Sequence, residues 1–209
     1  MNFPCDDGSD PHVKAWKKEY SSATWKGPYN IGPLKSIVPS GARILDVGCG
    51  SGKILAPLVR AGYHVIGVDV AREGLLMVRD GRDCLVEGDA RCLPFKDLVF
   101  DAVVCYDVLQ HLYDRERGLA VAEILRVLVH GGRVFIEGFG RQDMRYGGTE
   151  VEPHTFRRES SIIHHYFSES ELRELLRAID PVIDSRLTRK AFHGNQYLRH
   201  RLSATGIKK

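Results

Sequence analysis

Short apolar runs alternate with segments of helical periodicity between residues 41 and 140. Five such runs are closed off by glycine or polar residues, at 44–47, 65–68, 84–86, 102–106 and 134–136. After the first run, apolar side chains recur at helical spacing from Ile54 to Val59, and Gly62 ends the segment. Uninterrupted apolar strands that alternate with amphipathic helices are typical of a parallel sheet covered on both faces. The pattern therefore predicts an α/β fold, with a doubly wound, mainly parallel sheet and helices on both faces.

Two segments bound this alternating region. A last helix around Ile124 is predicted to end at Gly131-Gly132, before the fifth strand. Residues 140–165 are polar and glycine-containing, which predicts an insertion. Residues 1–40 precede the first strand and are expected to carry one or two short helices. We therefore expect a helical preamble over 1–40 and one main domain over 41–209.

The pattern changes again near the C-terminus. Ser168 and Glu171 make a capping box for an amphipathic helix, which Pro181 ends. Two further runs, 182–188 and 191–202, have the length and spacing of paired strands. We expect them to form an antiparallel pair at the edge of the sheet.

Composition excludes several classes of protein. The chain has 209 residues, of which 43% are hydrophobic and 27% charged, as in ordinary globular domains. No apolar run approaches the roughly 18 residues that a membrane-spanning helix needs. The first ten residues hold three aspartates and no apolar stretch, unlike a secretory leader. We therefore expect a cytoplasmic protein with no membrane contact.

The net charge of +3 is unevenly distributed. Residues 185–209 contain no acid and seven basic residues, namely Arg186, Arg189, Lys190, Arg199, Arg201, Lys208 and Lys209. Such a segment is consistent with a polyanionic partner. It is equally consistent with a solvated edge strand that uses cations against aggregation.

A glycine-rich loop follows the first strand, in the segment Asp46-Val47-Gly48-Cys49-Gly50-Ser51-Gly52. Glycines at alternate positions let the backbone turn sharply and approach a ligand closely. A dinucleotide-binding loop would need its third glycine at Lys53. A phosphate-binding P-loop would need glycine at Val47 and a hydroxyl at Ile54. Both phosphate-binding interpretations therefore fail on residue identity.

Acidic residues follow the predicted strands in turn, at Asp46, Asp69, Asp89 and Asp107. In an open parallel sheet, ligands bind beyond the carboxyl ends of the strands, where the strand order reverses. A carboxylate at the end of the second strand can bind both hydroxyls of a ribose. An acidic crevice of this kind suits a cationic nucleoside better than a pyrophosphate.

These segments together resemble the class I S-adenosylmethionine-dependent methyltransferases. The glycine loop resembles the first motif of that family, and Gly67-Val68-Asp69 resembles the second. Gly88-Asp89-Ala90, followed by Leu93-Pro94-Phe95, resembles the third. The segments 100–104 and 109–112 resemble the fourth. The resemblance covers residues 40 to 140 and implies a Rossmann-like fold with S-adenosylmethionine as cofactor.

The resemblance also implies a set of cofactor-binding residues. Asp69 would bind the ribose hydroxyls, Asp89 the adenine amino group, and Asp46 would lie near the amino group of the methionine. The complete set is Asp46, Gly48, Cys49, Gly50, Gly52, Asp69, Val70, Asp89, Ala90 and Tyr106.

The methyl acceptor is less well defined. No Asn/Asp-Pro-Pro-Tyr box follows the fourth strand, which disfavours an adenine or amide nitrogen, and no metal-binding set is evident. His111, His165 and Asp107 are the candidate general bases, each with packing or hydrogen bonding as the alternative role. Tyr20, Trp25 and Tyr29 are expected to cover the cofactor or the acceptor, and the insertion 140–165 is expected on the acceptor side.

Three functions remain open from sequence alone. The first is methyl transfer to a small molecule, which we take as the main hypothesis. The second is methyl transfer to RNA, with the basic C-terminal segment on phosphates. A short stretch around Arg158 and Tyr166 is weakly similar to tRNA wobble-uridine carboxyl methyltransferases. The third is a cofactor-binding scaffold that activates a protein partner.

Overall fold

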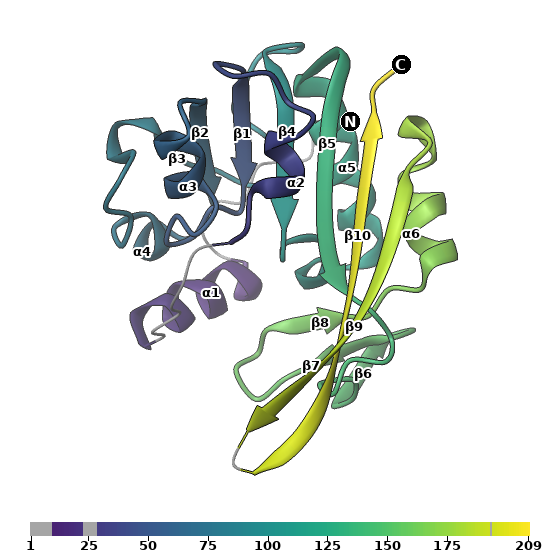
Figure 1. Ribbon diagram of the computed structural model, residues 1–209. Helices are drawn as coiled ribbons and strands as arrows, with labels where there is room; N and C mark the ends of the chain where they lie inside the picture. The colour runs from purple at the N-terminus through teal and green to yellow at the C-terminus, as the bar shows by residue number, and fades with distance from the viewer. Residues whose placement is uncertain (1–9, 23–28, 193) are drawn as a thin grey trace.

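One mixed seven-stranded sheet forms the centre of the molecule. The computed structural model describes residues 10–22, 29–192 and 194–209, and the expectation for Trp25 falls outside them. The strand order is β3-β2-β1-β4-β5-β10-β9. The strands are β1 (Arg43–Val47), β2 (His64–Asp69), β3 (Leu85–Glu87), β4 (Phe100–Tyr106), β5 (Leu128–Phe139), β9 (Val182–Phe192) and β10 (Asn195–Ile207). The first five run parallel, whereas β10 is antiparallel to both of its neighbours. The predicted fold and its antiparallel edge are confirmed (Figure 1).

Helices cover both faces of this sheet. They are α1 (Pro11–Ser22), α2 (Gly32–Lys35), α3 (Leu55–Arg60), α4 (Arg72–Leu75), α5 (Asp114–Val127) and α6 (Glu169–Leu175). The helix α6 begins at the predicted capping box, in which the Glu171 backbone N–H donates to Ser168 Oγ. Within the described residues, no helix is long and apolar enough to cross a bilayer.

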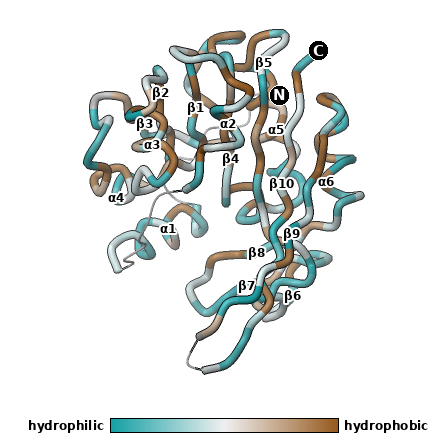
Figure 2. The backbone as a smooth tube through the Cα atoms, viewed as in Figure 1, coloured by the Kyte–Doolittle hydropathy of each residue, from teal (hydrophilic) through white to brown (hydrophobic). Residues whose placement is uncertain are grey.

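Two apolar cores lie on opposite faces of the sheet because successive strand residues point to opposite sides. On β1, Leu45 packs in the core that α5 and α6 cover, and Ile44 packs in the core with α2 and α3. In Figure 2, hydrophobic segments run along β5 within the sheet, whereas β10 turns hydrophilic where it leaves the sheet. The sheet is therefore covered by apolar side chains on both faces, and the polar residues of the candidate site lie at its strand ends.

Two predicted boundaries are wrong. The edge strands were expected at 182–188 and 191–202, but β9 continues to Phe192 and β10 begins at Asn195. The helix α5 ends at Val127 rather than at Gly131-Gly132, and Leu128 is already extended, with φ −82° and ψ 136°. Leu128 pairs with Phe100 on β4 and is fully buried, so it is the first residue of β5 and not part of the helix. An apolar residue at this position fits both a helix and a strand pattern, which explains the error.

The polar segment after β5 forms a second, small sheet. Its strands are β6 (Thr149–Glu152), β7 (Thr155–Arg157) and β8 (Ile163–His165), in that order and antiparallel. It lies below the carboxyl ends of the parallel strands, beside the extended end of the β9–β10 ribbon (Figure 1). The helix α1 lies under the same strand ends, nearer to β1 and β2 (Figure 1).

Candidate active site

The loop after β1 folds as its glycines require. Gly48, Gly50 and Gly52 have φ angles of 69°, 49° and 79°, which favour glycine over other residues. A Cβ atom at Gly48 would clash with Val108, and one at Gly50 with the hydroxyl of Tyr20. The chain therefore turns tightly here, with backbone and side chains packed directly against it.

Two carboxylates lie behind this loop. The Gly50 N–H donates to Asp69 Oδ2 and the Ala71 N–H to Asp69 Oδ1, both at 2.9 Å. Burial raises the pKa of Asp69 to about 6. Asp46 is only 1% exposed, and its Oδ2 has no hydrogen-bond partner within the described chain. Burial, and then the charge of Asp69, raise the pKa of Asp46 to about 8. Asp46 thus presents an unpaired buried acceptor that a cationic group would satisfy.

The third predicted carboxylate has a strong partner inside the protein. Asp89 accepts from Arg91 Nε at 3.0 and 2.9 Å and from Nη2 at 2.6 Å. Arg91 also pairs with Glu116, and with Asp10 at 3.0 Å. Because Asp10 directly precedes α1, this ion-pair cluster ties the helix to the end of β3.

Two adjoining cavities open at these strand ends. The smaller, of about 80 Å³, lies between α1 and the carboxyl ends of β2 and β3. It brings together five of the predicted cofactor-binding residues, Gly48, Asp69, Val70, Asp89 and Ala90. The larger, of about 850 Å³, is lined by Asp46, Cys49, Gly50 and Tyr106 among others. Gly52 lines neither cavity, and a Cβ there would contact Val78.

Five residues line both cavities, so the two spaces adjoin. They are Trp16, Tyr20, Gly48, Asp107 and His111. Trp16 and Tyr20 come from α1, so this helix forms one wall of both cavities. Tyr20 is therefore placed where a covering residue was expected.

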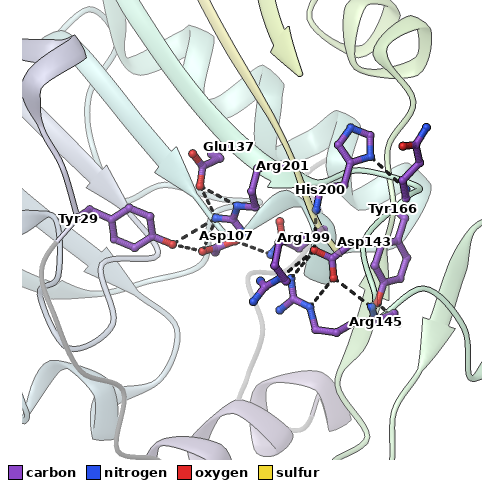
Figure 3. Close-up of polar contacts among 11 residues, drawn as sticks. Tyr29, Asp107, Glu137, Asp143, Arg145, Tyr166, Arg199, His200 and Arg201 are labelled. Carbon is purple, nitrogen blue, oxygen red and sulfur yellow. Dashed lines mark hydrogen bonds and ion pairs between the residues drawn. The ribbon is translucent and has the colours of Figure 1, made fainter. Parts of the chain in front are cut away.

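A partly buried ion-pair network lines the larger cavity (Figure 3). Arg201 of β10 donates to Asp107 Oδ1 at 2.6 Å and to Asp107 Oδ2 at 2.9 Å, and it also pairs with Glu137 of β5. The Tyr29 hydroxyl donates to Asp107 as well. Although burial alone would raise it, the Arg201 charge holds the pKa of Asp107 well below its usual range. Asp107 is therefore a fixed charge and a poor general base.

The histidines divide between the cavity and the core. His111 and His164 line the larger cavity, with ring centroids 4.9 Å apart. His165, the predicted candidate, is 1% exposed and lines neither cavity. Its Nδ1 lies 2.8 Å from Thr155 Oγ1, and its Nε2 lies 2.7 Å from Glu171 Oε1. Adjacent residues of β8 point to opposite faces, so the cavity receives His164 instead.

The protonation of His111 follows from its surroundings. Its Nδ1 lies 2.8 Å from the Ile163 carbonyl oxygen, which can only accept, so Nδ1 carries the proton. Its Nε2 is then an acceptor. Burial lowers the pKa of His111 well below its usual value, and burial lowers that of His164 to about 4. Both rings are neutral at physiological pH.

Sequence reasoning missed the role of Arg201, which it saw only as one of seven cations in a segment that either faces a polyanion or forms a solvated edge strand. Arg201 and Asp107 are 94 positions apart, and Arg201 and Tyr29 are 172 apart. Pairing of β10 with β5 brings these residues together. No local pattern reports such a pairing, so the network could be found only from the three-dimensional arrangement.

Comparisons with known proteins agree with this geometry. Residues 45–136 match a family model described as a methyltransferase domain. The chain is 34% identical over 122 residues to a ubiquinone biosynthesis O-methyltransferase of Xylella fastidiosa, covering 54% of this chain and 49% of the relative. It is 37% identical over 98 residues to a probable tRNA methyltransferase 9B of Bos taurus, covering 46% of this chain and 21% of the relative. The chain thus spans about half the length of the first relative and about a fifth of the second.

Solved structures share the fold over most of the chain. A SAM-dependent methyltransferase of Methanosarcina mazei has a TM-score of 0.66 at 25% identity, covering 88% of this chain and all of the other. The 1,6-didemethyltoxoflavin-N1-methyltransferase of Burkholderia thailandensis, solved with S-adenosylhomocysteine, has a TM-score of 0.69 at 23% identity. That match covers the whole of this chain and 93% of the other.

The fold and the glycine loop with its carboxylates define a nucleoside-binding α/β domain. Residues 45–136 match the methyltransferase-domain family, and the chain has the fold of S-adenosylmethionine-dependent methyltransferases. The residues present fit that cofactor, because the unpaired Oδ2 of buried Asp46 would accept from a methionine ammonium group. The glycine loop also leaves no space for side chains where the ligand would approach.

Proposed function

We propose that this protein transfers a methyl group from S-adenosylmethionine to a small molecule held in the larger cavity. The observation that carries the proposal is that the two cavities adjoin, with five shared lining residues. The smaller cavity collects the predicted nucleoside-binding residues, and the larger one leaves about 850 Å³ beside it. Ligand sites of several hundred Å³ are typical for small molecules.

On the cofactor side, the protein supplies binding and orientation. Asp69 is proposed to bind the ribose and Asp46 the ammonium group, with Tyr106 beside the methionine. The cofactor supplies a methyl group that bonds to an acceptor lone pair as the carbon–sulfur bond breaks, and the sulfur keeps the electron pair. Such a displacement depends mainly on how the reacting atoms are positioned.

For the methyl acceptor, we propose that His111 acts as the general base when the nucleophilic atom carries a proton. Its Nδ1 is held by the Ile163 carbonyl, which leaves Nε2 to accept. His111→Gln should slow turnover and remove the low-pH limb of the rate profile, while a nucleophile without a proton should be methylated normally. Equal loss for both kinds of acceptor would assign His111 a packing role.

An RNA acceptor receives less support. Several of the basic C-terminal residues are engaged within the protein: Arg199 and Arg201 line the cavity in ion pairs, and Arg186 pairs with Asp184. Lys208 Nζ donates to the carbonyls of Leu125 and Leu128 at the end of α5. The seven cations of the basic segment therefore do not form one outer surface for an RNA backbone.

The test measures cofactor binding and turnover separately. Calorimetry should show that the purified chain binds S-adenosylmethionine and S-adenosylhomocysteine, and that NAD and ATP do not bind. Incubation with a small-metabolite extract should then produce S-adenosylhomocysteine, and RNase treatment should not reduce its yield. Binding without turnover on any extract would favour the scaffold hypothesis instead.

A further inference from the structure

A cluster of cations lines the larger cavity on the side formed by the segment after β5 and by the β9–β10 ribbon. It consists of Arg145 and Arg158, from the segment after β5, and Lys190 and Arg199, from the β9–β10 ribbon. Figure 3 shows Arg145 and Arg199 converging on Asp143. We call these four residues the cationic wall.

The cationic wall has more positive charge than its carboxylates neutralise. Asp143 is the carboxylate shared by Arg145 and Arg199, at 2.7 and 3.0 Å. Arg158 donates to two backbone carbonyls, of Arg145 and Gly147, which carry no formal charge. Within the described part of the chain, Lys190 makes no hydrogen bond or ion pair. Four cations therefore share one carboxylate.

Arg199 also keeps free donors. Only its Nε donates to Asp143, and its two terminal amino groups meet no acceptor in the described residues. Its side chain is 20% exposed and lines the cavity. Guanidinium groups with free parallel donors match the geometry of carboxylate and phosphate groups.

The register of the ribbon places these cations on one face. Arg199 pairs with Thr188, and Lys190 pairs with Tyr197. Because alternate residues of a strand share a face, Thr188 and Lys190 both reach the cavity, as Arg199 does from β10. Arg189 occupies the intervening position, points to the opposite face and does not line the cavity.

We propose that the cationic wall binds a carboxylate or phosphate group of the methyl acceptor, so that the substrate is an anionic small molecule. This inference rests on the proposed function, because it assigns the acceptor class of the same cavity. The anion is a recognition group, and another atom of the acceptor takes the methyl group. The cavity then holds opposite charges at its two ends, with the cationic cofactor at the acidic strand ends.

The experiment uses small probes on the protein saturated with S-adenosylhomocysteine. Inorganic phosphate, benzoate and the neutral isostere benzamide are titrated by calorimetry at constant ionic strength. Benzoate or phosphate should bind saturably and benzamide should not, and the stronger of the two anions identifies the acceptor group. Equal binding of benzoate and benzamide, or no saturable binding of either anion, would overturn the inference.

Three variants test which residues bind the anion. Lys190→Gln and Arg199→Gln should each weaken anion binding roughly tenfold, since each removes charge-assisted contacts. Arg189→Gln removes the same charge from the opposite face of the ribbon and should change affinity less than about twofold. Lys190 is exposed and its side chain makes no hydrogen bond or ion pair with the described residues, so its variant stays informative if Arg199→Gln unfolds at a lower temperature. An equal effect of Arg189→Gln would show a diffuse charge effect and refute the site.

Two further readouts separate the possible failures. Binding of S-adenosylhomocysteine is measured first. If S-adenosylhomocysteine does not bind, the proposed function is refuted, and the anion titration is then done on the free protein to test the anion site separately. A bulk tRNA sample is titrated in parallel. Tighter binding of tRNA than of the small anions, with equal losses in all three variants, would contradict the inference and favour RNA.

Discussion

Affinity for S-adenosylhomocysteine is expected to rise with pH between about 6.5 and 8, because Asp46 must be charged to bind the ligand's ammonium group. The pKa of Asp46 in the free protein is raised to about 8 by burial. The ammonium group stabilises the charged carboxylate, so the bound protein holds fewer protons than the free protein. Affinity therefore increases as protons are removed.

The size of this effect follows from the pKa. With a free pKa of about 8, Asp46 is charged in about 3% of molecules at pH 6.5 and in about half at pH 8. The association constant should then rise about 15-fold over this interval, or about 1.6 kcal/mol. The window lies above the pKa of about 6 of Asp69, which therefore contributes little.

The assay is titration calorimetry in two buffers of different ionisation enthalpy, which counts the protons released. Binding at pH 6.5 should release nearly one proton. The control ligand is 5′-methylthioadenosine, which lacks the amino-acid part and should bind with little pH dependence. Asp46→Asn should abolish both the proton release and the pH dependence for S-adenosylhomocysteine. A flat profile for the wild type, or the same slope with 5′-methylthioadenosine, would refute the assignment of Asp46.

Four further predictions concern stability and binding. Asp46→Asn should raise the melting temperature of the ligand-free protein more near pH 8 than near pH 5, because the cost of a carboxyl with a raised pKa grows as the pH rises from the unfolded value of about 3.8 to the folded value of about 8; an equal gain at both pH values would contradict this. Asp69→Asn should weaken S-adenosylhomocysteine binding at least tenfold in calorimetry, since an amide can keep only one of the two bonds from the Gly50 and Ala71 N–H groups and loses the charge of the proposed ribose contact. Arg201→Gln should lower the free energy of unfolding in urea by about 3 kcal/mol at neutral pH, because two carboxylates lose their partner; a loss below about 1 kcal/mol would not fit the observed network. Lys208→Met should cost about 1 kcal/mol through loss of its bonds to the last carbonyls of α5, with ligand binding unchanged, whereas Lys209→Met serves as the matched control.

The arrangement of the residues proposed to bind the cofactor was predictable because its signals are local. Three glycines at alternate positions require the positive φ angles that they adopt in the loop. Asp46, Asp69 and Asp89 each follow an apolar run, and parallel strands bring their carboxyl ends to one edge. Sequence order alone therefore places these residues around one crevice.

The acceptor half was less predictable because it depends on pairing between distant segments. His164 and His165 are indistinguishable until the phase of β8 is known, and that strand is only three residues long. Arg201 was seen as one of seven cations in a basic segment, yet its position on β10 places it against Asp107. Spacing along the chain carries no information about these contacts.

The place of β10 in the sheet has a consequence for synthesis on the ribosome. Strands β1 to β5 are complete by Phe139, and with them the glycine loop and its carboxylates. The strand β10 enters afterwards, between β5 and β9, and carries Arg201 to the network that includes Tyr29. A nascent chain can thus form the smaller cavity early. The larger cavity is completed only when Tyr29 and Arg201, from opposite ends of the described chain, come into contact. Until then, a bound cofactor would have no completed cavity beside it in which a methyl acceptor could bind.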